Sequence, residues 1–80
     1  MATYVIMLKE YEDSDILVYL FGPDRQSLGK MQFFRTTGEY LQLKPVPNTD
    51  SLFYFQRTAA MLMSCYESGL QYPERTHYAS

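Results

Sequence analysis

The sequence predicts an α+β fold: a four-stranded antiparallel β-meander with one C-terminal helix packed on one face. Short apolar segments rich in β-forming residues recur along the first half of the chain. Brief polar segments separate them, which favours antiparallel neighbours. One amphipathic segment follows, with apolar residues at helical spacing. Eighty residues allow a single domain, 1–80, with a thin core.

The four strands are expected at about 3–9, 16–21, 29–35 and 39–44. Gly22-Pro23-Asp24 and Thr36-Thr37-Gly38 have turn chemistry, and two prolines, Pro45 and Pro47, end the last strand. Alternation predicts a core face that carries Ile6, Leu8, Val18, Leu20, Met31, Phe33, Leu41 and Leu43. The other face is then expected to carry Val5, Met7, Leu17, Tyr19, Phe21, Phe34 and Tyr40.

The helix is expected at about 51–68, between Asp50 as N-cap and Gly69 as the residue that ends it. The tail, 70–80, is polar with one proline, and we expect it to be loosely held. The helix stripe predicted to face the sheet contains Leu52, Phe55, Ala59, Leu62, Met63 and Tyr66.

The composition excludes several classes of protein. A net charge of −2 gives no general attraction to nucleic acid or anionic lipid. The apolar runs are shorter than the ~20 residues of a membrane span, and no secretory signal is visible. The single cysteine, Cys65, rules out an internal disulfide and fits a reducing compartment. A cytoplasmic protein is therefore expected.

The segment EYEDSD, residues 10–15, holds four of the nine acids between two apolar runs. In a meander, this loop, Glu39 and the end of the helix at Glu67 lie at one end of the sheet. The sequence therefore predicts an acidic pole, made of Glu10, Glu12, Asp13, Asp15, Glu39 and Glu67. The predicted partner-binding residues are Glu10, Tyr11, Glu12, Asp13, Asp15 and Glu39, with Tyr11 as an aromatic anchor. The alternative is a solvated loop that keeps a small domain soluble.

A second possible interface consists of apolar side chains outside the predicted core. Tyr54, Met61 and Cys65 line the predicted back of the helix, and Tyr19 and Phe34 lie on the predicted outer sheet face. Such surfaces fit either a homodimer or another protein. Alternatively, the tail folds over one of them.

No catalytic, metal or cofactor site is predicted. Cys65 and His77 are the only residues of their kinds, too few for a zinc site. EYEDSD has no glycine and no EF-hand spacing, which argues against calcium. The aromatic residues of the sheet lack the cations that direct nucleic-acid binding needs, and only Lys30 shares their face.

An acidic, motif-free α+β domain of under a hundred residues, with EYEDSD, Glu39 and Glu67 at one pole, resembles the small anti-defence proteins of phages, of which the anti-CRISPR proteins are the best-known group. The resemblance covers the whole chain in size, charge and architecture and transfers no residue. It implies stoichiometric inhibition in the host cytoplasm, with acids competing for a basic nucleic-acid site on a protein complex. The leading prediction is therefore a non-enzymatic protein-binding domain, and the alternative is a structural homodimeric accessory protein.

Overall fold

The computed structural model describes residues 4–47 and 51–79. The predicted α+β architecture is confirmed, because four antiparallel strands form one open sheet and a C-terminal helix packs on it. A fifth strand extends the sheet, whose strand order is β4-β3-β2-β1-β5. The elements are β1 (Tyr4–Glu12), β2 (Ile16–Asp24), β3 (Ser27–Phe34), β4 (Tyr40–Lys44), α1 (Ser51–Ser68) and β5 (Arg75–Ala79).

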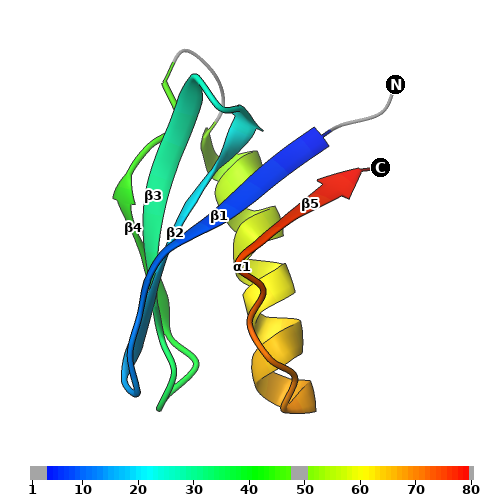
Figure 1. Cartoon of the computed structure of the whole chain (residues 1–80). Coiled ribbons are helices and arrows are strands. Elements are labelled where there is room, and N and C mark those ends of the chain that lie inside the picture. The colour runs from blue at the N-terminus through cyan, green and yellow to red at the C-terminus, as the bar shows by residue number, and fades with distance from the viewer. Residues whose placement is uncertain (1–3, 48–50, 80) are drawn as a thin grey trace.

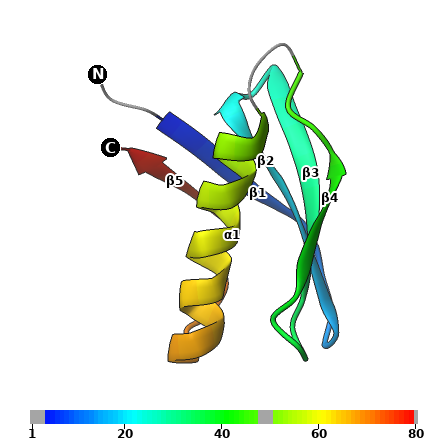
Figure 2. The same cartoon turned by 180° about the vertical axis from the view of Figure 1, so that it is seen from behind.

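The sheet bends around the helix. β2, β3 and β4 run beside α1, while β1 and β5 cross it (Figures 1 and 2). The turns β1–β2 and β3–β4 and the C-terminal end of α1 all lie at the same end of the molecule, at the bottom of Figure 1. No helix among the described residues combines the length and hydropathy that a membrane span requires.

The core lies between α1 and the sheet face that it covers. Leu62 and Ala59 of α1 are buried there, and Phe33 packs edge-on against Tyr66 with ring centroids 5.9 Å apart. The sheet contributes the fully buried side chains of Val5, Met7, Leu17, Tyr19, Phe21, Met31 and Phe33.

The predicted core face is correct for β3 and wrong for β1, β2 and β4. Ile6, Leu8, Val18 and Leu20 lie on the face away from α1 and are only partly buried. Leu41 and Leu43 are exposed, at 42% and 47%. The set expected on the opposite face of β1 and β2 forms the core instead. In β1 and β2 both faces are apolar, so alternation carries little information about which face the helix covers.

A bulge in β1 adds to this difference. The pairing of β1 with β2 shifts between Lys9, which lies opposite Tyr19, and Tyr11, which lies opposite Val18. The extra residue, Glu10, interrupts the alternation of faces. Lys9 and Glu12 therefore both lie on the α1 side of the sheet, whereas Tyr11 lies on the other side.

The tail was wrongly expected to be loosely held. Residues 75–79 form β5, which pairs with β1 from Tyr4 opposite Ala79 to Leu8 opposite Arg75. Before this strand, Tyr72 enters the core, and the hydroxyl of Tyr19 donates to the carbonyl oxygen of Pro73.

Local contacts fix both ends of α1. The Ser51 hydroxyl accepts a hydrogen bond from the Val46 N–H at 2.9 Å and donates one to Gln42 Oε1 at 2.6 Å, so the helix start is tied to β4. At the other end Gly69 has a positive φ of 69°, and the Leu70 N–H donates to the Cys65 carbonyl at 3.0 Å. This is the expected C-terminal cap. The expected N-cap, Asp50, lies outside the described residues.

Candidate protein-binding surfaces

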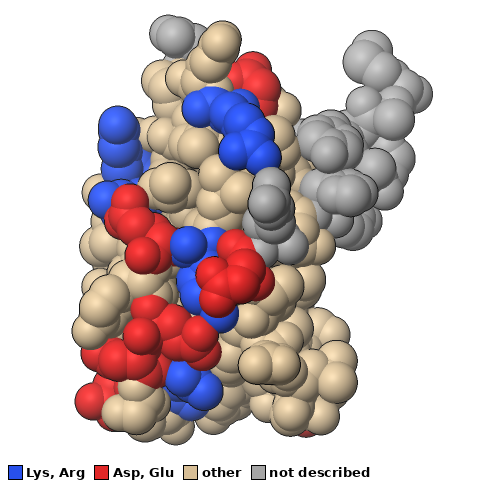
Figure 3. Space-filling view, in the orientation of Figure 1, with Lys and Arg blue, Asp and Glu red and all other residues tan. Residues whose placement is uncertain are grey.

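The acidic turns of two different hairpins are brought together at one end of the sheet. Two backbone hydrogen bonds hold these turns: the Arg35 backbone N–H donates to the Asp15 backbone carbonyl at 2.8 Å, and the Phe34 backbone N–H donates to the Glu39 backbone carbonyl at 2.8 Å. Asp15 and Glu39 therefore flank the end of β3 from its two sides. The side chain of Tyr66 packs on Gly38, so the C-terminal part of α1 also reaches this end. In Figure 3 the acidic side chains at this end are interleaved with basic ones.

The Asp13 carboxylate stabilises the β1–β2 turn. Its Oδ1 accepts hydrogen bonds from the N–H groups of Asp15 and Ile16, both at 2.8 Å, and its Oδ2 accepts one from the Tyr11 hydroxyl at 2.8 Å. The Ile16 N–H, then the Tyr11 hydroxyl and the Asp15 N–H, stabilise the charged form and lower the pKa of Asp13 below its ordinary value. This carboxylate is therefore a structural part of the turn.

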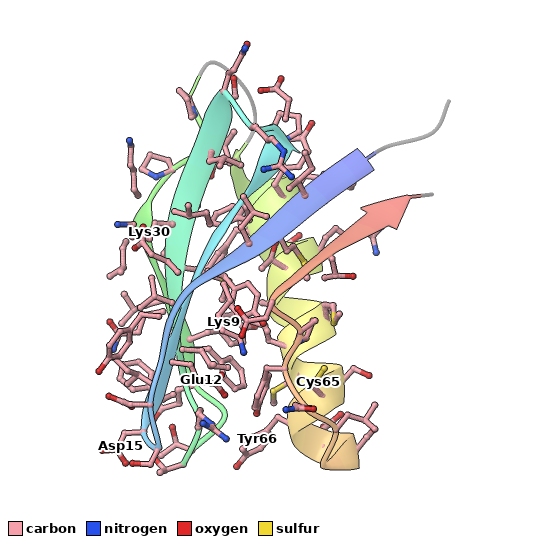
Figure 4. The ribbon with its side chains drawn as sticks, in the orientation of Figure 1. Lys9, Glu12, Asp15, Lys30, Cys65 and Tyr66 are labelled. Atoms are coloured by element: carbon pink, nitrogen blue, oxygen red, sulfur yellow. The ribbon has the colours of Figure 1, made fainter. Side chains whose placement is uncertain are left out.

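Glu12 is held in an ion-pair network on the α1 side of the sheet (Figure 4). Its two oxygens meet Lys9 Nζ at 2.5 Å and Arg35 Nη1 at 3.1 Å. Arg35 also donates to the Asp13 carbonyl at 2.6 Å, and Lys9 reaches Glu74 at 3.5 Å. The network joins β1, the β3–β4 turn and the tail, so its charges compensate one another within the fold.

Lys9 is unusual for a lysine, because only 7% of its side chain is exposed. Burial alone lowers the pKa of Lys9, but the hydrogen bonds and charges of Glu12 and Glu74 outweigh it, and the pKa is raised. Lys9 and Glu12 also line a pocket of about 300 Å³ with the tail residues Gln71 to Glu74. The charged groups of this pocket are paired with one another and with Arg35.

Glu10 lies apart from the other predicted contact residues. From the bulge in β1 it forms an ion pair with Lys30 of β3 at 2.9 Å. Lys30 alternates with the buried Met31, so this pair lies on the face away from α1, as Figure 4 shows for Lys30. The predicted placement of Glu10 among the turn acids is therefore wrong.

Asp15, Glu39 and Tyr11 are the members of the predicted contact set that remain exposed and outside these ion pairs. Tyr11 has an exposed fraction of 49%, and its hydrogen bond to Asp13 fixes the ring beside the turn. We call Tyr11, Asp15 and Glu39 the acidic turn surface. It is smaller than the acidic pole that the sequence predicts.

The residues of the second predicted interface lie in different environments in the structure. Tyr19 and Cys65 are buried in the core, so their placement on free surfaces is wrong. Tyr54 and Met61 are half-buried and pack against the edge of the core instead of forming an open helix back. Phe34 does lie on the outer sheet face, half-buried.

The outer face, meaning the side of the sheet away from α1, carries a different set of apolar residues from the set that the sequence predicts, with Phe34 common to both. Its cross-strand neighbours are Ile16 with Phe34, Val18 with Tyr11 and Gln32, Leu20 with Leu8 and Lys30, and Leu41 with Gln32. All of these side chains are exposed or half-buried, and no described segment covers them. The signal in the sequence was the apolar character of both faces of β1 and β2.

The reactive groups are poorly placed for chemistry. Burial raises the pKa of the Cys65 thiol, so the nucleophilic thiolate is disfavoured. Among residues 4–47 and 51–79, no three His, Cys, Asp or Glu residues gather in a way that could hold a metal ion. The acidic turn surface and the outer sheet face can offer charge and contact to another molecule.

Comparison of the chain with models of protein families, with curated proteins and with solved structures found no match.

Proposed function

We propose that the protein is a non-enzymatic protein-binding domain that acts in the cytoplasm as a small inhibitor. In this proposal the acidic turn surface lies against a basic, nucleic-acid-binding surface of a partner complex. Its carboxylates take the place that phosphates would occupy. The partner is a protein, and the domain itself has no direct contact with nucleic acid or membrane.

The observation that supports this proposal most is the juxtaposition of Asp15 and Glu39. They belong to different hairpins, yet backbone hydrogen bonds to the end of β3 hold both in place. Acids on such a fixed support lose little conformational freedom when they bind, so more of their interaction energy is available for affinity. Tyr11 adds an exposed aromatic ring, the residue type that often anchors an interface.

The test compares two variants that change the net charge equally. In the first, Asp15→Asn and Glu39→Gln neutralise the acidic turn surface. In the control, Asp24→Asn and Glu74→Gln neutralise two acids elsewhere, and the amides can still accept the hydrogen bonds from Gln26 and Lys9. The wild type, used as bait in a lysate of the native host or target cell, identifies the partner. Affinity is then measured with the purified partner.

We expect the first variant to bind about 10-fold more weakly and with a smaller salt dependence, because complementary charges are lost. The control should bind like the wild type. Equal affinities for wild type and first variant would refute the acidic turn surface as the contact. Equal weakening in both variants would show that only net charge matters, which also contradicts the proposal.

A further inference from the structure

The middle of the outer face carries a charged pair among apolar side chains. Glu10 of β1 and Lys30 of β3 meet at 2.9 Å, and both remain partly exposed, at 43% and 35% of their side chains. β2 separates these two strands and is the central strand of the five. The ion pair therefore spans β2 at the centre of the face, with Leu20 beside Lys30 on that strand.

We propose that a second copy of this chain packs on the outer face, sheet against sheet, about a two-fold axis that runs between the sheets along β2. The symmetry of the charges leads to this arrangement. An axis along β2 exchanges the two sides of that strand, so the β1 side of one copy faces the β3 side of the other. Glu10 then lies opposite Lys30 of the second copy, and Lys30 opposite its Glu10.

The alternative axis, in the interface but perpendicular to β2, brings Glu10 onto Glu10 and Lys30 onto Lys30. Like charges brought together in an interface are strongly disfavoured. The ion pair thus selects one of the two symmetric ways to stack these sheets. Its role is orientation more than affinity, because a desolvated ion pair gains little net free energy.

The apolar residues fit the same axis. Ile16, Val18 and Leu20 of β2 lie on it and meet their own copies, which gives three successive aliphatic contacts. Their cross-strand neighbours Leu8 and Phe34 extend the apolar contact to either side. Aligned sheets of this kind pack about 10 Å apart with strands within about 30° of each other.

The available area limits this dimer to reversible association. The two longest dimensions of the molecule, 33 and 23 Å, limit its largest face to about 750 Å². A standard interface buries about 800 Å² on each partner, whereas obligate dimers bury more than ~2,000 Å² in total. The bend of the sheet reduces the contact below this limit. We therefore expect a dimer that dissociates at micromolar concentrations.

The inference is independent of the proposed function. The axis along β2 leaves Asp15 and Glu39 uncovered and places both copies of this acid pair at the same end of the dimer. Tyr11, which lies opposite Val18 on the outer face, borders the dimer contact. A partner with two neighbouring basic sites would then engage both.

Sedimentation velocity on the full chain tests the dimer. Between about 1 and 500 µM, the mass should rise from 9.4 kDa toward twice that value. Leu20→Lys should abolish the rise, while Leu70→Lys should leave it unchanged. The control adds the same charge at a leucine that is 61% exposed beyond the end of α1. A mass of 9.4 kDa at every concentration would overturn the proposal. So would equal behaviour of the two variants, with circular dichroism confirming that both are folded.

A charge swap tests the axis. The double variant Glu10→Lys/Lys30→Glu keeps an ion pair within each chain, so it should fold and dimerise with itself. In a mixed dimer with wild type, each acid of the pair faces an acid of the other chain, and each lysine faces a lysine. Fluorescence energy transfer between differently labelled chains should then show a mixed dimer at least about 10-fold weaker than either homodimer. Mixed dimers as strong as the homodimers would contradict the two-fold arrangement.

Discussion

Phe33 and Phe34 are neighbours in β3 whose side chains point to opposite faces of the sheet, and replacing each by alanine has very different predicted costs. Phe33 is fully buried between Tyr66 and Tyr72, with ring centroids 5.9 and 6.0 Å away. Removing a buried Phe ring costs about 3–5 kcal/mol. Phe34 lies half-buried on the outer face. Its loss should cost about 1 kcal/mol, roughly half of the transfer free energy of a fully buried side chain.

The predicted cost of Phe33→Ala is a large fraction of the total free energy of unfolding. At about 0.05–0.15 kcal/mol per residue, the free energy of unfolding of this chain is roughly 4–12 kcal/mol. Phe33→Ala should therefore leave the domain marginally folded or unfolded at 25 °C, while Phe34→Ala stays folded.

Urea unfolding followed by circular dichroism measures both values, at about 1 µM protein so that association through the outer face contributes little. The difference between the two variants should exceed about 2 kcal/mol. An equal loss in both, or a greater loss for Phe34→Ala, would show that α1 does not cover the face assigned to it.

Three further predictions concern buried or paired groups. Tyr19→Phe removes the hydroxyl that donates to the Pro73 carbonyl, which should lower the unfolding free energy by about 1 kcal/mol. Amide hydrogen exchange in β5 should become faster, and exchange at the wild-type rate would contradict this prediction. Folding lowers the pKa of Asp13, so this carboxylate stabilises the fold above its unfolded-state pKa and loses that contribution as pH falls through its folded-state pKa. Asp13→Asn should therefore make the unfolding free energy depend less steeply on pH on the acid side. An unchanged slope would contradict the structural role of Asp13. Cys65, buried with a raised pKa, should resist Ellman's reagent at about pH 8 until urea unfolds the chain, whereas rapid modification of the native protein would be inconsistent with its burial.

Periodicity predicted the architecture but not the orientation of two strands. In β3 the core-facing Met31 and Phe33 alternate with Lys30 and Gln32, so the polar face is visible in the sequence. β1 and β2 offer no such contrast, because Val5 and Met7 alternate with Ile6 and Leu8, and Leu17 and Tyr19 with Val18 and Leu20. The helix can cover either side of such strands, and long-range packing decides which.

The tail shows a different limit. Its polar composition predicted a loose segment, but its backbone completes the ladder of β1, which would otherwise be an edge strand. Tyr72 and the Tyr19–Pro73 hydrogen bond hold the segment that precedes β5. Thr76, His77 and Tyr78 were the available signal, since all three are compatible with a strand.

The candidate site was predictable in position and not in detail. Meander topology correctly placed the EYEDSD turn beside Glu39 and the end of α1. The ion pairs of Glu12 with Lys9 and Arg35 depend on the bulge at Glu10 and on the twist of the sheet. Neither feature has a local sequence signature here, so the sequence predicts an acidic pole that is larger than the acidic turn surface of the folded protein.

Backbone amide chemical-shift mapping of the ¹⁵N-labelled protein with its purified partner tests the proposed contact most directly. The account predicts that the largest changes occur at Tyr11, Asp15 and Glu39 and their neighbours in the two turns, and that they diminish at high salt. Large changes confined to the exposed face of α1, around Arg57 and Ser64, with both turns unaffected, would contradict it.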